Sequence, residues 1–368
     1  MNILDAANVF GKQSFEELPF NEVDALVFAA LAYINLEAAS PKLEEGKEPI
    51  PLKELDITHP APLFHGTYDE ANNKSLIKRL KKSVRYQDVK VGYGLSRTDK
   101  QEVIQFAAYS FLLPDETLII SYRGTDMSFV GAKEDLLICY GTEIPSQKQA
   151  VSYIKEVLGY YPNNPLIILG HSKGGNLAAY SSLMIEEQDF LRVKKVYHFD
   201  GPDFRYPPKT YEDRKGRIVK YMTKNDIVGL FYNVTENPII ISSPSPVLGG
   251  HDPFSWVVNK KSMSLRHLKK RSKFSFQCER ILQDWLSPLS DEDLQLAVDG
   301  LSRIFGKSET LFDLFFRWIP DLLRAKGSLK DYTPEQRKRF KEIFFGLYEA
   351  ARDSFKKESK AIPEAPQI

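Results

Sequence analysis

From about residue 166 onward, short apolar runs alternate with segments that favour helix. Residues 166–170 are an apolar run that predicts a buried strand, and a helix is predicted from Gly175 to about Glu187. Two further strands are predicted at residues 193–199 and 217–223. Strands and helices that alternate at about thirty residues favour a parallel sheet with right-handed crossovers. We therefore predict an α/β fold.

The chain ahead of residue 166 shows a different pattern of predicted elements. A largely buried helix is predicted at residues 20–37, with Asn21 as its N-cap, and an amphipathic helix at residues 70–86. Three closely spaced strands follow, at residues 89–95, 103–113 and 117–122. Their tight spacing predicts an antiparallel edge on the same sheet. An irregular section is expected after Asp126, and then a helix at residues 146–158.

Beyond about residue 263 the pattern becomes helical. Helices are predicted at residues 274–286, 291–305, 309–325 and 334–356, with Pro320 bending or breaking the third. Residues 361–368 are rich in proline and are expected to be disordered. We therefore divide the chain into a sheet domain at residues 1–262, a helical subdomain at residues 263–360, and this tail.

Composition narrows the classes of function. The 50 Lys and Arg residues nearly balance 49 Asp and Glu residues, so no bulk charge favours nucleic acid as a partner. Only two cysteines occur, without metal-ligand spacing, which suits a reducing compartment. The first residues lack a basic region followed by an apolar signal core. We expect a cytoplasmic protein.

Residues 170–174, Gly-His-Ser-Lys-Gly, lie between the predicted strand and helix and form a G-x-S-x-G pattern. This pattern in a strand–turn–helix context is typical of a nucleophile elbow, a tight turn that holds a serine in a strained backbone conformation. The flanking glycines are needed because a Cβ there would clash where strand and helix approach each other. Ser172 is therefore the candidate nucleophile.

A serine hydroxyl needs a base, normally a histidine held by a carboxylate. His251 follows Gly249-Gly250 in a segment that we expect to be a flexible loop, and it is our candidate base. His267 lies in a basic segment that resembles a solvated helical face. His198 lies inside a predicted strand, and His171 should point away from the serine.

Two aspartates are candidates for the carboxylate that holds the histidine. Asp226 follows the strand at residues 217–223, at the edge of the sheet where catalytic groups gather, and it is our first choice. Asp200 ends the strand before it and is the alternative. Asp203 and Asp252 are weaker candidates.

An acyl-transfer site also needs two donors for the oxyanion. We expect one to be the backbone N–H of Lys173, directly after the nucleophile. The other is expected from the turn at residues 122–126, where Thr125 offers a backbone N–H and a hydroxyl.

These motifs together resemble a known family. The segments Tyr-Arg-Gly-Thr, Gly-His-Ser-Lys-Gly-Gly-Asn-Leu-Ala, Phe-Asp-Gly-Pro and Lys-Asn-Asp-Ile-Val occur in this order. They resemble the Mbeg-like domain-of-unknown-function family of bacterial α/β-hydrolases and, more distantly, the class 3 (fungal-type) lipases. The resemblance covers about residues 15 to 260. It implies an α/β-hydrolase fold for residues 1–262.

The resemblance also implies roles for single residues. Carried over position by position, the lipase oxyanion donor falls on Thr125, the nucleophile on Ser172, the acid on Asp226 and the base on His251. Two positions depart from the lipases: Lys173 stands where they usually carry leucine, and Ala132 stands where a tryptophan is expected.

The expected function is hydrolysis of a carboxylic ester, of a small molecule or a lipid, through a Ser-His-Asp triad without cofactor or metal. A thioesterase or an amidase, and an inactive hydrolase fold used as a scaffold, remain alternatives. A phenylalanine-rich segment at residues 311–318 is most simply a helical core, although a lid, an acyl-binding wall or a peripheral membrane contact also fits. The basic residues 269–271 are a weak candidate for an anionic partner. The oligomeric state is left open.

Overall fold

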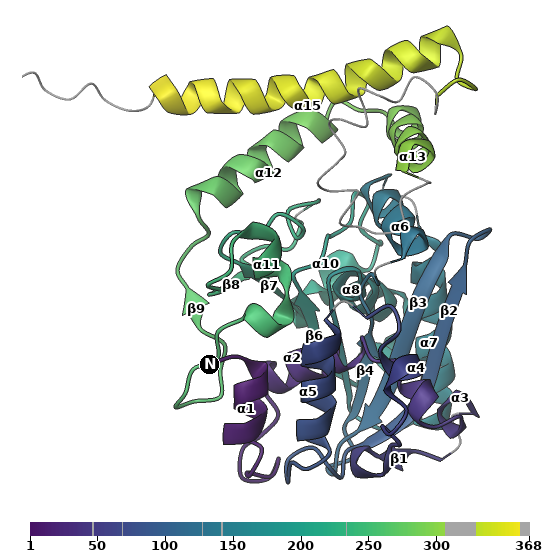
Figure 1. Ribbon diagram of the computed structural model, residues 1–368, viewed down its shortest axis with the longest axis vertical. Helices are drawn as coiled ribbons and strands as arrows, with labels where there is room; N and C mark the ends of the chain where they lie inside the picture. The colour runs from purple at the N-terminus through teal and green to yellow at the C-terminus, as the bar shows by residue number, and fades with distance from the viewer. Residues whose placement is uncertain are drawn as a thin grey trace, which may run out of the picture. The chain divides into compact units, whose positions relative to one another are not determined.

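The computed structural model describes residues 1–45, 48–67, 69–126, 128–140, 143–232, 234–305 and 329–360 (Figure 1). Contacts divide the chain into two compact units, Met1–Arg271 and Ser272–Ile368. Each unit is described by itself below.

Within the described residues, the first unit is built on a nine-stranded sheet whose strands lie in chain order. Strands β1 to β4 are antiparallel to one another, β4 to β8 are parallel, and β9 is antiparallel to β8. The predicted antiparallel edge and parallel remainder are therefore confirmed. The strands are β1 (Ile50–Pro51), β2 (Lys90–Asp99), β3 (Ile104–Leu112), β4 (Leu118–Tyr122), β5 (Leu166–His171), β6 (Val193–Phe199), β7 (Ile218–Thr223), β8 (Ile239–Ile241) and β9 (His267–Leu268).

Helices cover both faces of this sheet. One face packs against α1 (Ile3–Val9), α2 (Glu22–Leu31) and α5 (Glu70–Leu80). The other face packs against α7 (Pro145–Tyr160) and α8 (Lys173–Met184), and α6 (Phe129–Tyr140) contacts β3. Shorter helical turns connect these elements. They are η1 (Leu36–Ala39), α3 (Lys42–Glu45), η2 (Leu52–Glu54), α4 (Pro60–Phe64), α9 (Glu187–Phe190), α10 (Tyr211–Arg214), η3 (Lys215–Arg217), α11 (Val247–His251) and η4 (Pro253–Ser255).

The central strands are apolar on both faces because helices cover both. In β4 and β5 every residue is buried. Successive side chains of a strand point to opposite faces, so Ile119 and Ile167 join the core beneath α2, whereas Ile120 and Ile168 join the core beneath α7 and α8. This arrangement is an α/β-hydrolase fold, and it brings the carboxyl ends of β5, β6 and β7 to one edge of the sheet.

Several elements of the first unit differ from the predictions, among them the helix predicted at residues 70–86, which ends at Leu80. The helix predicted at residues 20–37 ends at Leu31, and the separate turn η1 follows it. The irregular section expected after Asp126 contains the helix α6. The sequence pattern did not predict α6, because Glu134 points into the protein and the apolar positions of the helix do not form one stripe. The strands β8 and β9 were not predicted, since runs of two or three residues give no clear period.

The second unit contains α12 (Lys273–Leu286), α13 (Asp291–Phe305) and α15 (Pro334–Lys360). The Trp285 indole donates to the Ile343 carbonyl at 2.8 Å, which ties α12 to α15. Asp293 pairs with Arg339 at 2.6 Å, which ties α13 to α15. The helix predicted at residues 309–325, the phenylalanine-rich segment and the tail lie outside the described residues.

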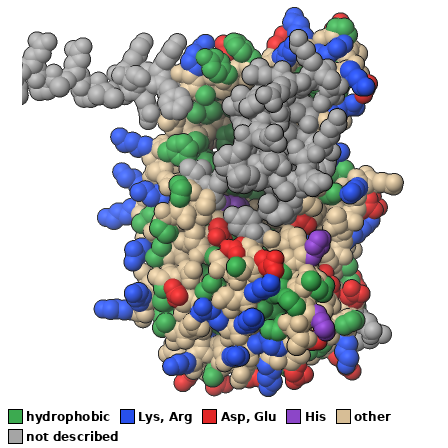
Figure 2. All heavy atoms as spheres, viewed as in Figure 1, with side chains coloured by type: hydrophobic (Ala, Val, Ile, Leu, Met, Phe, Trp, Pro, Cys, Tyr) green, Lys and Arg blue, Asp and Glu red, His purple; other side chains and the backbone are tan. Residues whose placement is uncertain are grey.

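Two surface properties bear on function. Acidic and basic side chains are interspersed over the part of the first unit that faces the viewer in Figure 2. In the described part of the chain, no helix combines the length and the apolar character that crossing a bilayer requires.

Candidate active site

Ser172 occupies the tight turn between β5 and α8. Its φ and ψ angles are 58° and −131°, a conformation that residues with a Cβ rarely adopt. The turn is fixed on both sides, because the Ser172 N–H donates to the Phe199 carbonyl at 2.8 Å and the Ser172 carbonyl accepts from Gly175 N–H at 2.9 Å. The serine is half-buried, and α8 begins at the next residue. The geometry is that of a nucleophile elbow.

Glycines permit this turn at three places. A Cβ on Gly170 would lie 2.1 Å from the Gly174 carbonyl oxygen, and one on Gly174 would lie 2.1 Å from the Tyr122 carbonyl oxygen. These distances explain why both ends of the G-x-S-x-G pattern are glycine. Gly201 is the third, since its Cβ would lie 2.2 Å from the Ser172 carbonyl oxygen. Sequence reasoning did not single out Gly201, because its contact partner is distant in the chain.

His251 lies at the end of the short helix α11, where we had expected a flexible loop. Its Nδ1 atom is 2.9 Å from Oδ2 of Asp200. The Trp256 indole donates to the Gly250 carbonyl at 3.0 Å and so fixes the segment directly before the histidine. Burial lowers the pKa of His251 below 6.5, and the nearby carboxylates oppose this effect. When Nδ1–H of the neutral imidazole donates to Asp200, the Nε2 lone pair is available as a base.

His171 helps to position His251. Its Nε2 donates to the His251 backbone carbonyl at 2.8 Å, and its Nδ1 accepts from the Tyr33 hydroxyl at 3.0 Å. Burial holds the pKa of His171 well below 6.5, so the ring is neutral and has one donor and one acceptor, as these two contacts require. We had expected His171 only to point away from the serine, and its support of His251 has no sequence signal.

The two candidate acids lie side by side at the ends of β6 and β7. Asp200 and Asp226 are both buried, and their carboxylates and the His251 imidazole each offer an atom within 4.8 Å of the others. The carboxylate that accepts from His251 Nδ1 is that of Asp200, the alternative acid. Asp226 accepts from the backbone N–H of Val228 at 2.8 Å and of Gly229 at 3.0 Å. Asp226, the first choice, therefore belongs to the cluster, while the hydrogen bond with the imidazole favours Asp200.

The two carboxyl groups are also coupled to each other. Their carboxyl oxygens lie within 4.8 Å of each other, and two buried negative charges this close repel, which disfavours ionisation of both at once. Burial raises the pKa of Asp200 to about 7. Burial, and then the charge of Asp200, raise the pKa of Asp226 well above its usual value. Both carboxyl groups are therefore harder to ionise than an exposed aspartate.

Among the described residues, Asp200, Asp226 and His251 are also the group of side chains close enough to hold a metal ion. The His251 nitrogen nearest to the carboxylates is already engaged with Asp200. The expectation that the site needs no metal stays a prediction.

The predicted oxyanion residues both contact α6. The Thr125 hydroxyl donates to Oδ1 of Asp135 at 2.7 Å. The Lys173 side chain is buried and pairs with Oε2 of Glu134 at 2.7 Å, so only its backbone N–H is left for an oxyanion. Burial raises the pKa of Asp135 to about 6. The side chain of Ala132, the position where a tryptophan was expected, lies outside the described atoms.

His267 and His198 have other partners. His267 is exposed but lies in β9, so the predicted helical face is wrong, and its Nε2 is 2.8 Å from Oε1 of Glu22. His198 lies inside β6 with its Nε2 3.3 Å from Asp203. Burial lowers the pKa of His198 to about 4. Asp203 also pairs with Lys220 at 3.0 Å. These contacts place His198 and Asp203 in a structural cluster, separate from the Asp200–His251 pair.

The Mbeg1-like family model matches residues 80–303, which is more than half of the chain. The chain belongs to the Mbeg1-like family. This confirms the family resemblance, but with other limits: the match begins at residue 80 rather than about 15, and it extends beyond residue 260 through α12 and most of α13. No curated protein matches the chain.

Several solved structures are similar at low identity. An MDLA mutant from Penicillium cyclopium is 15% identical, covers 68% of this chain and 85% of its own, and has a TM-score of 0.39. Lipase II from Rhizopus niveus is 14% identical, with 67% and 83% covered and a TM-score of 0.37. A Rhizomucor miehei lipase–propeptide complex is 14% identical, with 61% and 70% covered and a TM-score of 0.32.

The close approach at Gly201 gives a stability prediction. Gly201→Ala should lower the free energy of unfolding by about 1–3 kcal/mol, because the new methyl group meets backbone rather than a movable side chain. Gly159→Ala in α7 is the control. No atom lies within 4 Å of its Cβ position, so alanine should be neutral or stabilising by up to about 1 kcal/mol. Denaturant unfolding measures both, and equal stability of the two variants would contradict the proposed crowding.

Proposed function

We propose that the protein is a serine hydrolase that cleaves carboxylic esters, with Ser172 as nucleophile and His251 as general base. The observation that carries this proposal is the strained backbone of Ser172 at the elbow. His171, the residue before it, contacts the His251 carbonyl, and His251 Nδ1 lies 2.9 Å from Asp200. Backbone strain is costly, and in a protein it persists where surrounding structure enforces it, most often at functional sites.

The chemistry follows from this arrangement. The Ser172 hydroxyl attacks the ester carbonyl while Nε2 of His251 accepts its proton. The resulting oxyanion is stabilised by the backbone N–H groups of Lys173 and Thr125, since the Thr125 hydroxyl donates to Asp135. His251 then gives the proton to the departing alcohol, which leaves an acyl group on Ser172. Water attacks this acyl-enzyme by the same steps and releases the acid.

We propose that Asp200 is the carboxylate that holds the imidazole, and that Asp226 supports Asp200 from behind as a protonated donor. This assignment differs from our first choice for the acid. It is favoured by the Asp200–His251 contact, and by the backbone N–H groups of Val228 and Gly229 that hold Asp226.

The substrate proposed is an ester of a small molecule or a lipid, since the triad chemistry acts on acyl carbonyls. A thioester or amide would use the same steps, and no contact in the described residues favours either. A scaffold role is the competing function. The family resemblance and the low cysteine content lead us to propose the cytoplasm as the site of action.

Covalent labelling tests the nucleophile. A fluorophosphonate probe should label the wild type, because it reacts with an activated serine, and Ser172→Ala should lose the label. Ser75→Ala in α5, on the opposite face of the sheet, should label normally. Gel fluorescence after a fixed incubation gives the result. A folded wild-type protein that takes no label would favour the scaffold role, and full labelling of Ser172→Ala would place the nucleophile elsewhere.

Two asparagine variants separate the candidate acids. Asp200→Asn should lower kcat for a p-nitrophenyl ester by about 10⁴-fold, through loss of tautomer control over His251. Asp226→Asn should keep most of the activity, because a neutral amide can still donate to Asp200. Steady-state kinetics with both variants decide the matter. The reverse pattern would make Asp226 the acid, as the sequence first indicated.

The proposed role of His251 as general base predicts that the activity depends on pH. His251 must be neutral to accept the serine proton, so activity is lost as the pH falls through its pKa. Burial lowers the pKa of His251 below 6.5 and raises the pKa of Asp200 to about 7. Asp200 must be ionised to hold the imidazole, so the acid limb of kcat/KM should have its midpoint near pH 7. A pH–rate profile of the wild type measures this midpoint. A midpoint clearly below about pH 6 would show that the ionised Asp200 carboxylate is not required.

A further inference from the structure

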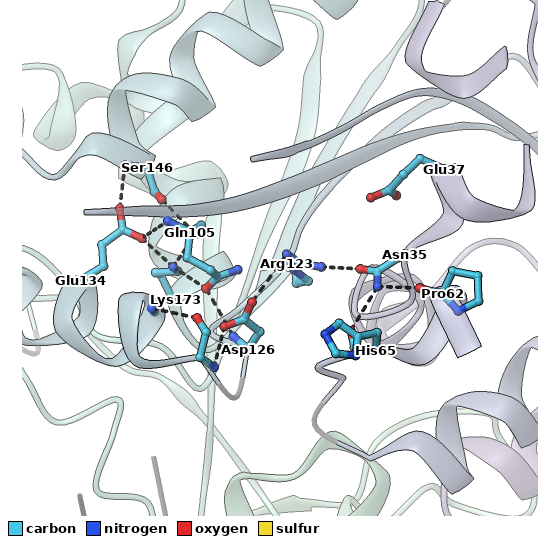
Figure 3. Close-up of polar contacts among 12 residues, drawn as sticks. Asn35, Glu37, Pro62, His65, Gln105, Arg123, Asp126, Glu134, Ser146 and Lys173 are labelled. Atoms are coloured by element: carbon cyan, nitrogen blue, oxygen red, sulfur yellow. Dashed lines mark hydrogen bonds and ion pairs between the residues drawn. The ribbon is translucent and has the colours of Figure 1, made fainter. Parts of the chain in front are cut away.

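Lys173, the residue directly after the proposed nucleophile, carries a buried charge that the proposed reaction does not use. Its side chain and that of Glu134 are both 0% exposed. The ammonium donates to the Gln105 carbonyl at 2.6 Å, to Gln105 Oε1 at 2.8 Å and to Glu134 Oε2 at 2.7 Å (Figure 3). An ammonium has three N–H groups, and these contacts occupy all of them. Lys173 therefore has no N–H left to act on Ser172 or on a substrate.

Stability alone is a poor reason for this ion pair. Desolvating two charges costs several kcal/mol each, and apolar residues of similar size in place of a buried pair are often neutral or stabilising. An apolar side chain at position 173 would pack with the apolar residues around α8 and would need no hydrogen-bond partner. The charge therefore points to a geometric task, which its contacts identify.

Gln105 joins the ammonium to the loop that carries Thr125. Its side-chain oxygen accepts from Lys173 Nζ and also from the backbone N–H of Asp126, at 3.3 Å. One amide oxygen thus lies between the elbow residue and the residue after Thr125. Figure 3 shows Lys173, Gln105 and Asp126 converging from the elbow, from β3 and from the loop after β4.

Glu134 closes the cluster from α6. Its Oε2 atom accepts from Lys173 and from the Gln105 N–H at 3.2 Å, and its Oε1 atom accepts from the Ser146 N–H at 2.8 Å, at the start of α7. The Ser146 hydroxyl donates to the Gln105 carbonyl at 3.1 Å. Next to Glu134 on the same helix, Asp135 accepts from the Thr125 hydroxyl. Consecutive carboxylates of α6 therefore contact both proposed oxyanion residues.

We propose that Lys173 is a positioning residue, whose ammonium, through Gln105 and Glu134, sets the distance between the elbow N–H and the Thr125 loop. Oxyanion donors act within 2.7–3.1 Å of the developing charge, and removal of one such donor typically costs about 10²–10³-fold in kcat. A loop that moves by a fraction of an ångström should cost less than a lost donor. The catalytic half of this inference rests on the proposed ester hydrolysis, whereas the loop-holding half does not.

The test is a double variant, Lys173→Met with Glu134→Gln, which removes both charges and leaves no unpaired ion. It is compared with Arg85→Met with Asp24→Asn, which removes another fully buried ion pair, formed by α2 and the segment after α5. Two readouts are used. They are kcat and KM for a fluorogenic short-chain ester, and hydrogen exchange at the Asp126 amide measured by NMR, with the Ile168 amide of β5 as an internal reference.

The inference predicts a kcat lower by about 10- to 100-fold with KM changed less than about twofold, because the donors act on the transition state. It also predicts exchange at Asp126 at least about tenfold faster, with Ile168 unchanged, because Gln105 loses an anchor. The Arg85/Asp24 variant should show neither effect. Normal kcat, a change in KM alone, or unchanged exchange at Asp126 in the folded Lys173/Glu134 variant would overturn the inference.

A second variant covers the case in which the double variant does not fold. Gln105→Leu cuts the link between Lys173 and Asp126 but keeps the Lys173–Glu134 ion pair, and the same two effects are expected. If Gln105→Leu behaves as wild type, the inference is wrong. If the wild-type protein hydrolyses no ester, the proposed function fails, and exchange at Asp126 still decides whether Lys173 holds the loop.

Discussion

The whole site depends on one close approach, that of β5 to the start of α8 at Ser172. The turn is so tight that backbone atoms lie where the Cβ atoms of Gly170, Gly174 and Gly201 would be. Ser172 carries its side chain in this turn at a positive φ. The sheet supplies the rigidity that holds this strain, since β5 is buried between β4 and β6 with helices on both faces. The candidate base and acids are arranged around that fixed point.

Much of this could be predicted from the sequence, because it depends on local chain geometry. The glycines at 170 and 174 mark the elbow, and the apolar runs at β5, β6 and β7 place Ser172, Asp200 and Asp226 at one edge. What could not be predicted depends on contacts between distant segments. The choice of Asp200 for the histidine contact, the support by His171, and Gly201 have no local signal. Helix α6 was hidden because Glu134, a polar residue, faces inward toward Lys173.

Buried ionisable side chains are a second feature of the site. Asp200, Asp226, Glu134 and Lys173 are all nearly or fully inaccessible to solvent, at a cost that only good partners offset. The two aspartates lie in one cluster with His251, and the ion pair with Glu134 and the Gln105 amide oxygen satisfy the lysine.

The most direct measurement of the central claim is the mass of the covalent intermediate. The protein is mixed with an excess of a p-nitrophenyl ester, quenched in acid within the first turnovers, and digested for mass spectrometry. The account predicts an acyl group on the peptide that contains Ser172, located at that serine. Ester consumption without an acylated serine, or acylation of a different residue, would contradict it.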